Sequence, residues 1–380
     1  MLAETLRTAE RLLRRTKETL PQNVSRVLLL EYRLPLGCLV HMTPVFEAMK
    51  RARPEIEISV ATRGLGLQVL RHSRFIDHLI ETPDPTTDLL GALRRLREEL
   101  CRRGIRPQCV LTGASDQRTK IALLGLLAAS GWRGGFTQAS GLYQHLLAYD
   151  SGLSLIGNNL RLADLLGCKT EATQPRVFFS ERDAATARTL LDEANPERRP
   201  VVAIVTQTSG GQNTGWHSER FVEVIRHAAL QRGFSLLYVG TAADAAAIDA
   251  IRKATGGLGS SLAGKTSVSE LAAVLALSDF VVTLDTGTMH VGRSVEVPMV
   301  VLGPSWQKPL EWMPLGVANV RILRGEDRVG VPEGYRLDEI SAESVIAALE
   351  ELVAIYPAND EARARRLQAS TSKINLIGGD

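Results

Sequence analysis

Short apolar runs of strand length alternate with longer segments of helical spacing along most of the chain. In the first half, strands are expected at residues 26–32, 55–62, 78–81 and 109–112. Helices are expected at residues 87–103 and 118–130, and a further helix is predicted to open at Thr43-Pro44. Thr can cap a first turn, and Pro at the first helical position loses no hydrogen bond.

The second half repeats this alternation. Apolar, β-branched runs typical of strands buried on both faces of a parallel sheet lie at residues 201–205, 234–239, 280–284 and 299–302. Helical patterns separate them at residues 219–232, 242–255 and 268–277. Alternation of this kind indicates βαβ units.

The pattern therefore predicts an α/β protein with two doubly wound parallel-sheet domains. They are expected over residues 25–180 and 198–355, joined by a polar linker at residues 196–200. Residues 1–24 form a helical N-terminal extension in this prediction, and residues 357–380 form a polar, poorly ordered tail. Residues 2–20 read as an amphipathic helix, which either touches a membrane surface or, the favoured interpretation, docks on the protein itself or a partner.

Composition narrows the functional classes. The 380 residues include 45 Lys and Arg against 42 Asp and Glu, a net charge of +3, so general nucleic-acid binding is not expected. No apolar run reaches the ~18 residues that a membrane helix needs. The four cysteines are scattered, without a zinc or disulfide pattern, and the N-terminus lacks a signal-peptide pattern. A cytoplasmic location is the expectation.

Two loops in the second half have the composition of phosphate-binding turns. Residues 206–216 follow one predicted strand, and residues 285–290 follow another. Small residues let the backbone approach an anion, and the following helix offers its N-terminal amides. Ordinary turns in α/β proteins look similar. Asp244 follows a third strand, where an acid either binds ribose hydroxyls or simply caps a helix.

These segments carry a resemblance. Residues 261–304, with AGKTS, DTGTMH and a VP strand ending in GP, resemble the donor-site signature of glycosyltransferase family 9. Residues 26–62 resemble the opening of that family, and WHSERF at residues 216–221 resembles its W-x-x-E-R-F. The family contains the ADP-heptose:lipopolysaccharide heptosyltransferases. The resemblance implies a GT-B architecture, two Rossmann-like domains facing a cleft, with the acceptor in the first and the nucleotide sugar in the second.

The resemblance also implies roles for individual residues. The donor sugar and its diphosphate would meet the 285–290 loop, and the diphosphate would also meet the 206–216 loop. The donor-binding residues expected on this basis are Thr206, Thr208, Ser209, Asp285, Thr286, Gly287, Thr288 and His290, with Asp244 at the ribose. No metal or other cofactor is expected, because helix N-termini and loop amides stabilise the departing diphosphate.

The chain departs from the family pattern at two reactive positions. The first turn of the family ends in L-G-D, whose Asp is the proposed general base, and here Cys38 stands in that place. A thiol would need activation to act as a base. His41 is the alternative base, although a structural role is the favoured interpretation of this histidine, and Cys38 could equally be a buried structural thiol. Thr214 replaces the usual Lys before the Trp. Lys265 or Arg293 could substitute for it, but the favoured interpretation is that both are ordinary surface residues.

The acceptor side is less specific. Arg118 and Lys120 follow a predicted strand end and could meet an anionic acceptor, or they are ordinary helix-surface charges. The resemblance thus implies an inverting, metal-independent transferase that moves a sugar, heptose by default, from an ADP-sugar to a glycan or lipid-linked acceptor. The two departures leave open a nucleotide-sugar- or glycan-binding protein without catalysis. A scaffold that docks through residues 1–22 is the third interpretation.

Overall fold

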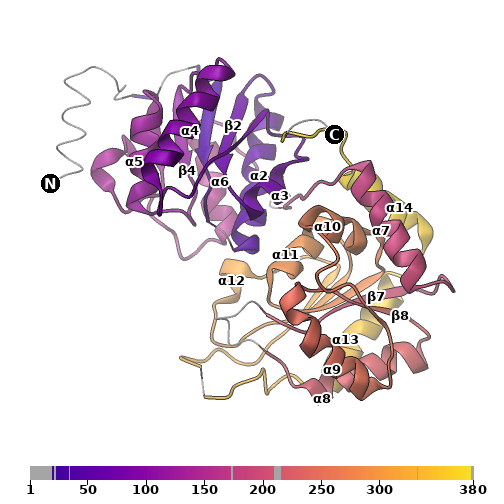
Figure 1. Cartoon of the computed structure of the whole chain (residues 1–380). Coiled ribbons are helices and arrows are strands. Elements are labelled where there is room, and N and C mark those ends of the chain that lie inside the picture. Colours follow the sequence, from indigo (N-terminus) through magenta and orange to yellow (C-terminus); the bar gives the residue numbers. More distant parts are fainter. Residues whose placement is uncertain are drawn as a thin grey trace. The chain divides into compact units, whose positions relative to one another are not determined.

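The computed structural model describes residues 19–20, 23–33, 35–172, 174–208, 215–331 and 333–377. The chain divides into two compact units (Figure 1). The first unit comprises Met1–Pro175 with Ile374–Asp380, and the second comprises Arg176–Lys373. Each unit is built on one parallel sheet of six described strands, so the α/β class predicted from the sequence is confirmed. The expected helix at residues 2–20 lies outside the described residues, apart from its last two positions.

The sheet of the first unit has the strand order β3-β2-β1-β4-β5-β6. Its strands are β1 (Arg26–Leu30), β2 (Glu57–Thr62), β3 (His78–Glu81), β4 (Cys109–Thr112), β5 (Trp132–Gly135) and β6 (His145–Leu146). Its helices are α2 (Leu36–Ala52), α3 (Leu65–Leu70), α4 (Leu89–Arg102), α5 (Thr119–Ala128) and α6 (Leu155–Leu165), with a short turn of helix at Ser140–Leu142. In the register, Val27 of β1 lies opposite both Ile58 of β2 and Cys109 of β4.

Helices cover both faces of this sheet. On one face, Leu28 and Leu30 of β1 join a core formed with residues of α4 and α5. On the other face, α2 packs against α6 and α3. Because successive side chains of a strand point to opposite faces, the residue that follows Leu30 is directed toward the α2 and α6 side.

The helix predicted to open at Thr43-Pro44 in fact begins at Leu36, and Pro44 lies inside α2. A proline in this position leaves the carbonyl of Val40 without its helical N–H partner. The Thr43 hydroxyl donates to that carbonyl, with Oγ1 and O 2.8 Å apart. The threonine therefore replaces the lost backbone bond, and the helix continues through the proline.

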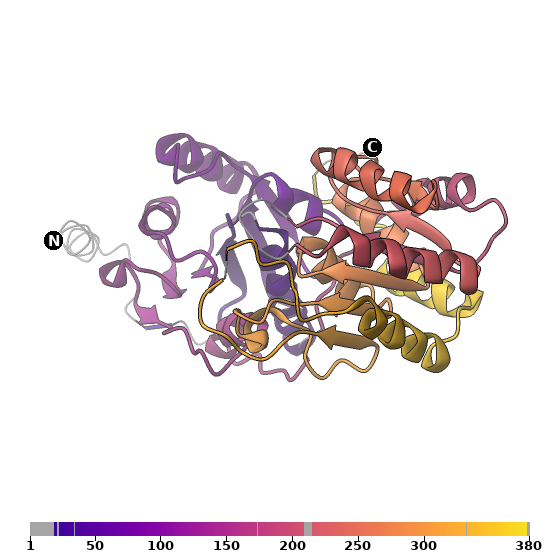
Figure 2. The ribbon, with the colours of Figure 1, turned by 90° about the horizontal axis from the view of Figure 1, so that it is seen from below.

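The sheet of the second unit has the order β12-β11-β10-β7-β8-β9, with helices on both sides (Figures 1 and 2). Its strands are β7 (Val201–Val205), β8 (Ser235–Tyr238), β9 (Ser260–Ser261), β10 (Phe280–Leu284), β11 (Met299–Leu302) and β12 (Val320–Leu323). Its helices are α7 (Glu181–Ala194), α8 (Ser218–Arg226), continued by a π-helical turn at His227–Gln231, α9 (Ala245–Thr255), α10 (Val268–Leu277), α11 (Gly287–Ser294), α12 (Pro309–Trp312), α13 (Ala342–Ile355) and α14 (Asp360–Ser370).

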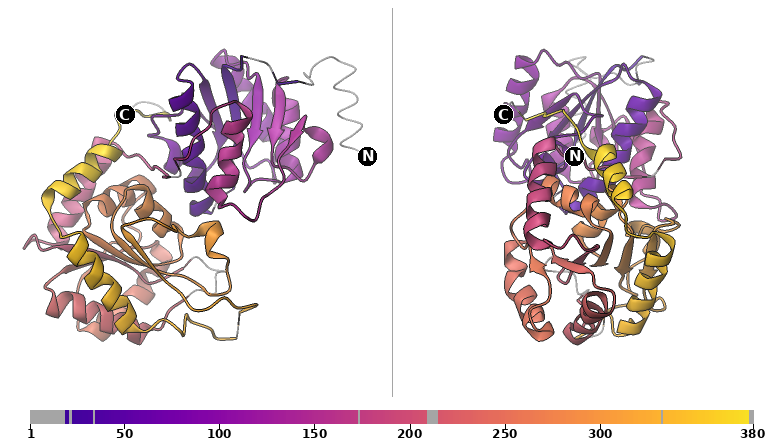
Figure 3. Two further views of the ribbon diagram at one scale, coloured as in Figure 1. Left: turned by 180° about the vertical axis from the view of Figure 1, so that it is seen from behind. Right: turned by 90° about the vertical axis from the view of Figure 1, so that its right-hand side faces the viewer.

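The core of this unit lies between the sheet and α8, α9 and α13. On the opposite face, α10 packs against α7, α11 and α14. Figure 3 shows the yellow α14 and the pink α7 at this face. The sequence interpretation missed α7, which follows a capping box in which Ser180 and Asp183 bond each other's backbone N–H groups.

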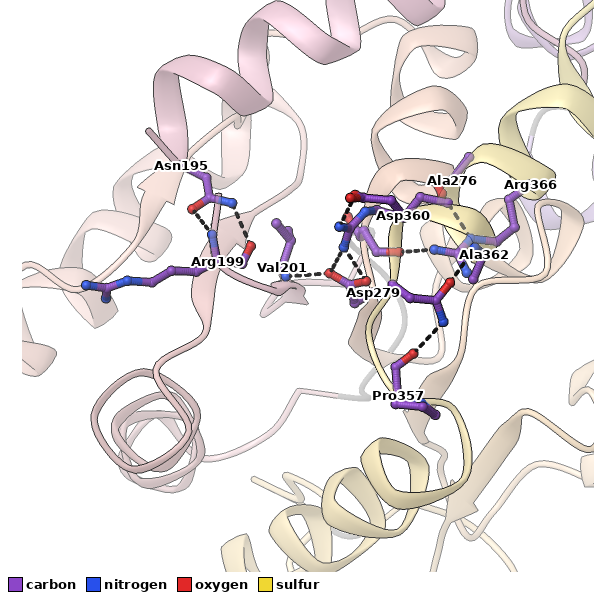
Figure 4. Close-up of polar contacts among 12 residues, drawn as sticks. Asn195, Arg199, Val201, Ala276, Asp279, Pro357, Asp360, Ala362 and Arg366 are labelled. Atoms are coloured by element: carbon purple, nitrogen blue, oxygen red, sulfur yellow. Dashed lines mark hydrogen bonds and ion pairs between the residues drawn. The ribbon is translucent and has the colours of Figure 1, made fainter. Parts of the chain in front are cut away.

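The poorly ordered tail expected after residue 357 is wrong, because α14 lies there and is anchored to the second unit (Figure 4). Asp279, which is 4% exposed, accepts a hydrogen bond from the Val201 N–H at 2.8 Å. The Arg363 guanidinium contacts both Asp279 oxygens, at 2.5 and 2.7 Å. Arg366 donates to the carbonyls of Ala276 and Ser278. A buried carboxylate thus holds a helix whose own sequence is polar.

The last described residues return to the first unit. The Leu376 N–H donates to the Arg71 carbonyl at 2.9 Å, and His72 Nδ1 lies 2.8 Å from the Ile374 carbonyl. Within the described residues, no helix is long and apolar enough to cross a membrane.

Candidate functional site

The candidate donor site lies at the carboxyl edge of the second sheet. From β7 the chain proceeds to β8 and β9 on one side, and then crosses to β10 and β11 on the other. β7 and β10 are neighbours, with Val205 opposite Thr283. Thr206 and Asp285 therefore leave the same edge at the point where the strand order reverses. Ligands of open α/β sheets bind at such switch points.

The turn after β10 is built to start a helix. Thr286 is the N-cap of α11, and its Oγ1 accepts a hydrogen bond from the Thr288 N–H at 3.0 Å. The first amides of a helix have no intrahelical acceptor, and the helix dipole favours an anion there. Gly287 opens this first turn, and it is only half-buried, as is Thr288. The turn can therefore accept a phosphate group on its exposed side.

Asp285 precedes this cap and is 4% exposed. Its N–H donates to the Leu302 carbonyl of β11, which fixes the backbone at the strand end. Burial raises the pKa of its carboxyl group to about 6. An aspartate that is hard to ionise, at the mouth of a helix N-terminus, is a candidate for contact with sugar hydroxyls.

His290 lies one turn further along α11 and is buried. Burial, helped by the charge of Arg293, lowers the pKa of its imidazole to about 3. Its ring centroid lies 6.4 Å from that of Trp312. His290 is therefore a neutral, packed side chain at physiological pH. Arg293, considered above as a substitute cation, is half-buried, and burial lowers its pKa to about 10.

The loop after β7 is described only at its ends. Thr206 is buried, and Thr208 is half-buried. Ser209 and Thr214 lie outside the described residues. Beyond the loop, Trp216 donates through Nε1 to the Ile340 carbonyl at 2.9 Å, and Arg220 donates to the same carbonyl at 2.6 Å. The WHSERF motif thus fastens α8 to the segment that leads into α13.

Asp244 follows β8 at the same edge. One of its carboxylate oxygens accepts from the Thr241 N–H at 2.7 Å and from the Thr241 hydroxyl at 2.8 Å. Gly264 of AGKTS, at φ +69°, lies against this loop, and a Cβ there would come within 2.8 Å of the Ala242 Cβ. The motif therefore brings two loops together, and Asp244 closes a helix cap with one oxygen. Lys265 is exposed beside it.

In the first unit, Cys38 lies in the first turn of α2 and is 5% exposed. Burial raises the pKa of its thiol to about 11, and the neighbouring charge of Glu31 adds to this rise. The thiol is therefore neutral at pH 7 and lacks the activation that a base requires. His41 does not lie near the helix start, as expected, but within α2, where it is 2% exposed.

The two expected acceptor residues already have partners within the first unit. Arg118 is the N-cap residue of α5, and its Nη2 lies 2.7 Å from Oδ1 of Asp116. Lys120 donates to the Thr86 carbonyl. Arg118 remains about one-third exposed, with 34% of its side-chain surface accessible.

Sequence reasoning missed Glu31, a buried glutamate directly after β1 that is 2% exposed. The available signal is an acid at the end of the apolar run VLLL, within the strand predicted at residues 26–32. No group of three or more His, Cys, Asp or Glu side chains in the described part of the chain is arranged to hold a metal ion.

The model of glycosyltransferase family 9 (heptosyltransferase) matches residues 112–328, more than half of the chain. The protein belongs to this family. It is 24% identical over 345 residues to lipopolysaccharide heptosyltransferase 3 of Escherichia coli K12, covering 83% of this chain and 95% of that protein.

Two solved structures have the same fold. The family 9 glycosyltransferase of Veillonella parvula aligns with a TM-score of 0.77 at 19% identity, covering 89% of this chain and all of the other. The E. coli ADP-heptose lipopolysaccharide heptosyltransferase II aligns with a TM-score of 0.72 at 18% identity, covering 88% and 100%. The resemblance to family 9 inferred from the sequence is confirmed, and the chain is a heptosyltransferase-like glycosyltransferase.

Proposed function

We propose that this glycosyltransferase transfers a heptose from ADP-heptose to a sugar of a lipopolysaccharide or related lipid-linked acceptor, with inversion and without a metal ion. The observation that carries the proposal is the Asp285-Thr286-Gly287 turn at the switch point of the second sheet. The names of two relatives, one an ADP-heptose enzyme and one a lipopolysaccharide enzyme, support the donor and the acceptor class.

The donor would be held mainly by neutral groups. The N-terminal amides of α11 would bind the diphosphate, together with the hydroxyls of Thr288, Thr206, Thr208 and Ser209. Asp285 would accept hydrogen bonds from the donor sugar. Asp244 would use the carboxylate oxygen that does not close its cap to bind ribose hydroxyls.

The reaction requires stabilisation of a leaving diphosphate. An acceptor hydroxyl oxygen attacks the anomeric carbon, the bond from that carbon to the phosphate oxygen breaks, and ADP departs with the electron pair. Preorganised amides at a helix N-terminus stabilise such developing charge without a cation. A single displacement of this kind inverts the anomeric centre.

The acceptor would bind to the first unit, where Arg118 and Lys120 supply positive charge near the carboxyl end of β4. If the acceptor is linked to a membrane, residues 2–20 would make a peripheral contact with the membrane surface.

A second candidate is a nucleotide-sugar-binding protein without transfer activity. The observation that favours it is Cys38, whose raised pKa makes it unfit to replace the carboxylate of the family pattern. The test is acceptor-dependent transfer from ADP-, GDP- and UDP-sugars, with and without EDTA. Transfer from ADP-heptose alone supports the enzyme, whereas binding without turnover for every donor supports the second candidate.

A further inference from the structure

Glu31 is a buried glutamate to which neither the sequence analysis nor the proposed function gives a role. It follows the last residue of β1, on the face of the sheet covered by α2 and α6, and only 2% of it is exposed. Its Oε2, Oδ1 of Asn159 and Sδ of Met42 converge on Gly113, where an added Cβ would lie 3.2 to 3.3 Å from each of them. The glycine after β4 therefore permits the close approach of these side chains.

One carboxylate oxygen of Glu31 is not engaged. Among the described residues, its buried Oε1 has no hydrogen-bond partner. A buried polar atom left in this state destabilises the fold, and such groups concentrate at functional sites. Burial and the nearby charge of Asp116 raise the pKa of Glu31, while the Arg33 backbone and the charge of Arg118 lower it.

The neighbouring carboxylate, Asp116, differs because its oxygens are occupied. Its Oδ2 accepts from the Tyr32 N–H at 2.8 Å, and its Oδ1 accepts from Arg118 Nε at 2.8 Å. Burial raises the pKa of Asp116 too, but the Arg118 guanidinium and the Tyr32 amide counter it. Two carboxylates in unlike environments are a common basis for dividing acid and base roles.

Glu31 follows the carboxyl end of β1, and Cys38 lies in the first turn of α2, the next element along the chain. Both residues therefore lie at the same edge of the first sheet, and the charge of Glu31 contributes to the raised pKa of Cys38. The family pattern has an aspartate at the place of Cys38. We propose that Glu31 is the general base of the transfer, with its carboxylate taking over the task of the missing aspartate.

The inference rests on the proposed function. Oε1 of Glu31 accepts the proton of the acceptor hydroxyl as its oxygen bonds to the anomeric carbon, and ADP leaves with the electron pair of the broken bond. Asp116 is a positioning residue, since its charge raises the basicity of Glu31 and its own oxygens are held by Tyr32 and Arg118. A carboxyl group with a raised pKa is a better base near neutral pH.

The test compares Glu31→Gln with the double variant Glu31→Gln/Cys38→Asp. Glutamine keeps the size of the side chain and removes the base, so kcat should fall by about 100-fold or more. The aspartate in the double variant returns a carboxylate to the family position. The kcat of the double variant should therefore be at least about tenfold higher than that of Glu31→Gln alone. ADP binding to the second unit should stay unchanged in both variants.

The pH profile adds a readout that a structural role would not move. The groups around Glu31 are Asp116, Arg118, Arg33 and Cys38. In the wild type, kcat/KM should fall as the pH falls through the raised pKa of Glu31. In the double variant, where a different carboxylate is the base, this fall in kcat/KM should occur at a different pH.

Glu99→Gln is the matched control. Glu99 is another buried glutamate of the first unit, 5% exposed, but it lies on α4 and bonds Arg102 and Arg103. Its substitution should leave kcat unchanged. The proposal is contradicted if Glu31→Gln keeps more than half of the wild-type kcat, if the double variant recovers nothing, or if Glu99→Gln loses as much. A wild-type protein that transfers from no donor would instead contradict the proposed function.

Discussion

Asp285, which we propose contacts the donor sugar, lies in an unfavourable environment for its charge. It lies at the switch point of the second sheet, and burial alone raises its pKa to about 6. Glu31, the proposed general base in the first unit, is also buried, and its Oε1 has no hydrogen-bond partner among the described residues. Burial of a carboxylate group destabilises the fold, and groups with such perturbed pKa values cluster at functional sites. Cys38 and Asp244, in contrast, have environments that local packing and capping explain.

Asp285→Asn should make the protein more stable at neutral pH and less active. The unfolded carboxyl titrates near 3.8 and the folded one at about 6, so the folded state binds more protons between these values. Wild-type stability is therefore lost as the pH rises through this window, by roughly 2–3 kcal/mol. Urea unfolding at pH 4 and pH 7.5 should show the variant gaining on the wild type as the pH rises. A constant difference at both pH values would refute this account.

At the scale of elements, the sequence pattern predicted the bounds of strands well where the strands are buried on both faces. β7, β10 and β11 have the predicted bounds, because an uninterrupted apolar run defines each. β5 was missed because its WRGG sequence contains Arg133, a fully buried arginine that donates to the carbonyls of Leu142 and Gly131. Such compensation depends on distant backbone, which a local pattern does not contain.

Helices with small contact faces were missed for a related reason. In α7 only Ala184 and Ala187 are buried, so the apolar period is too weak to detect. The turn after β10 was predictable, since its residues form a local cap. Glu31 was not, because the side chains gathered around it at Gly113 come from α2 and α6, which a local pattern at β1 does not contain.

The Thr43–Pro44 pair in α2 can be tested by a double-mutant cycle. Thr43→Val removes the hydroxyl that serves the buried Val40 carbonyl, and an unsatisfied buried acceptor costs about 1–3 kcal/mol. Pro44→Ala restores the backbone N–H that this carbonyl would otherwise use. The double variant should therefore be clearly more stable in urea unfolding than Thr43→Val alone. Equal stabilities for these two proteins would show that the hydroxyl does not replace the lost helical bond.

At the scale of the whole molecule, each unit includes segments that lie before or after its strands in the sequence. In the second unit, α7 precedes the first strand and α14 follows the last, and both helices pack against α10. The first unit includes the last described residues, which bond to Arg71 and His72. The sequence predicted two sheets because each has its own βαβ series, but the polar anchors that attach the terminal helix could not be read from a composition typical of a tail.

Removal of residues 357–380 should destabilise the second unit. It withdraws Arg363 from the buried Asp279, and breaking a buried ion pair typically costs about 3–5 kcal/mol. Adding Asp279→Asn to the truncated chain should recover part of the loss, because no buried charge then remains unpaired. In the full-length chain, Arg363→Met should lower the melting temperature, while Arg365→Met, at an exposed position of the same helix, should not. A truncated chain as stable as the wild type would show that α14 does not support the unit.

The most direct test of the central claim is acceptor-dependent release of ADP from ADP-heptose by the purified full-length protein, in the presence of EDTA. The acceptor is a lipooligosaccharide that lacks its outer heptose, and its mass is measured before and after the reaction. We expect ADP to appear only when the acceptor is present, and the acceptor to gain the mass of one heptose. ADP-heptose that binds but is never transferred, or transfer that proceeds equally from GDP- and UDP-sugars, would contradict the account.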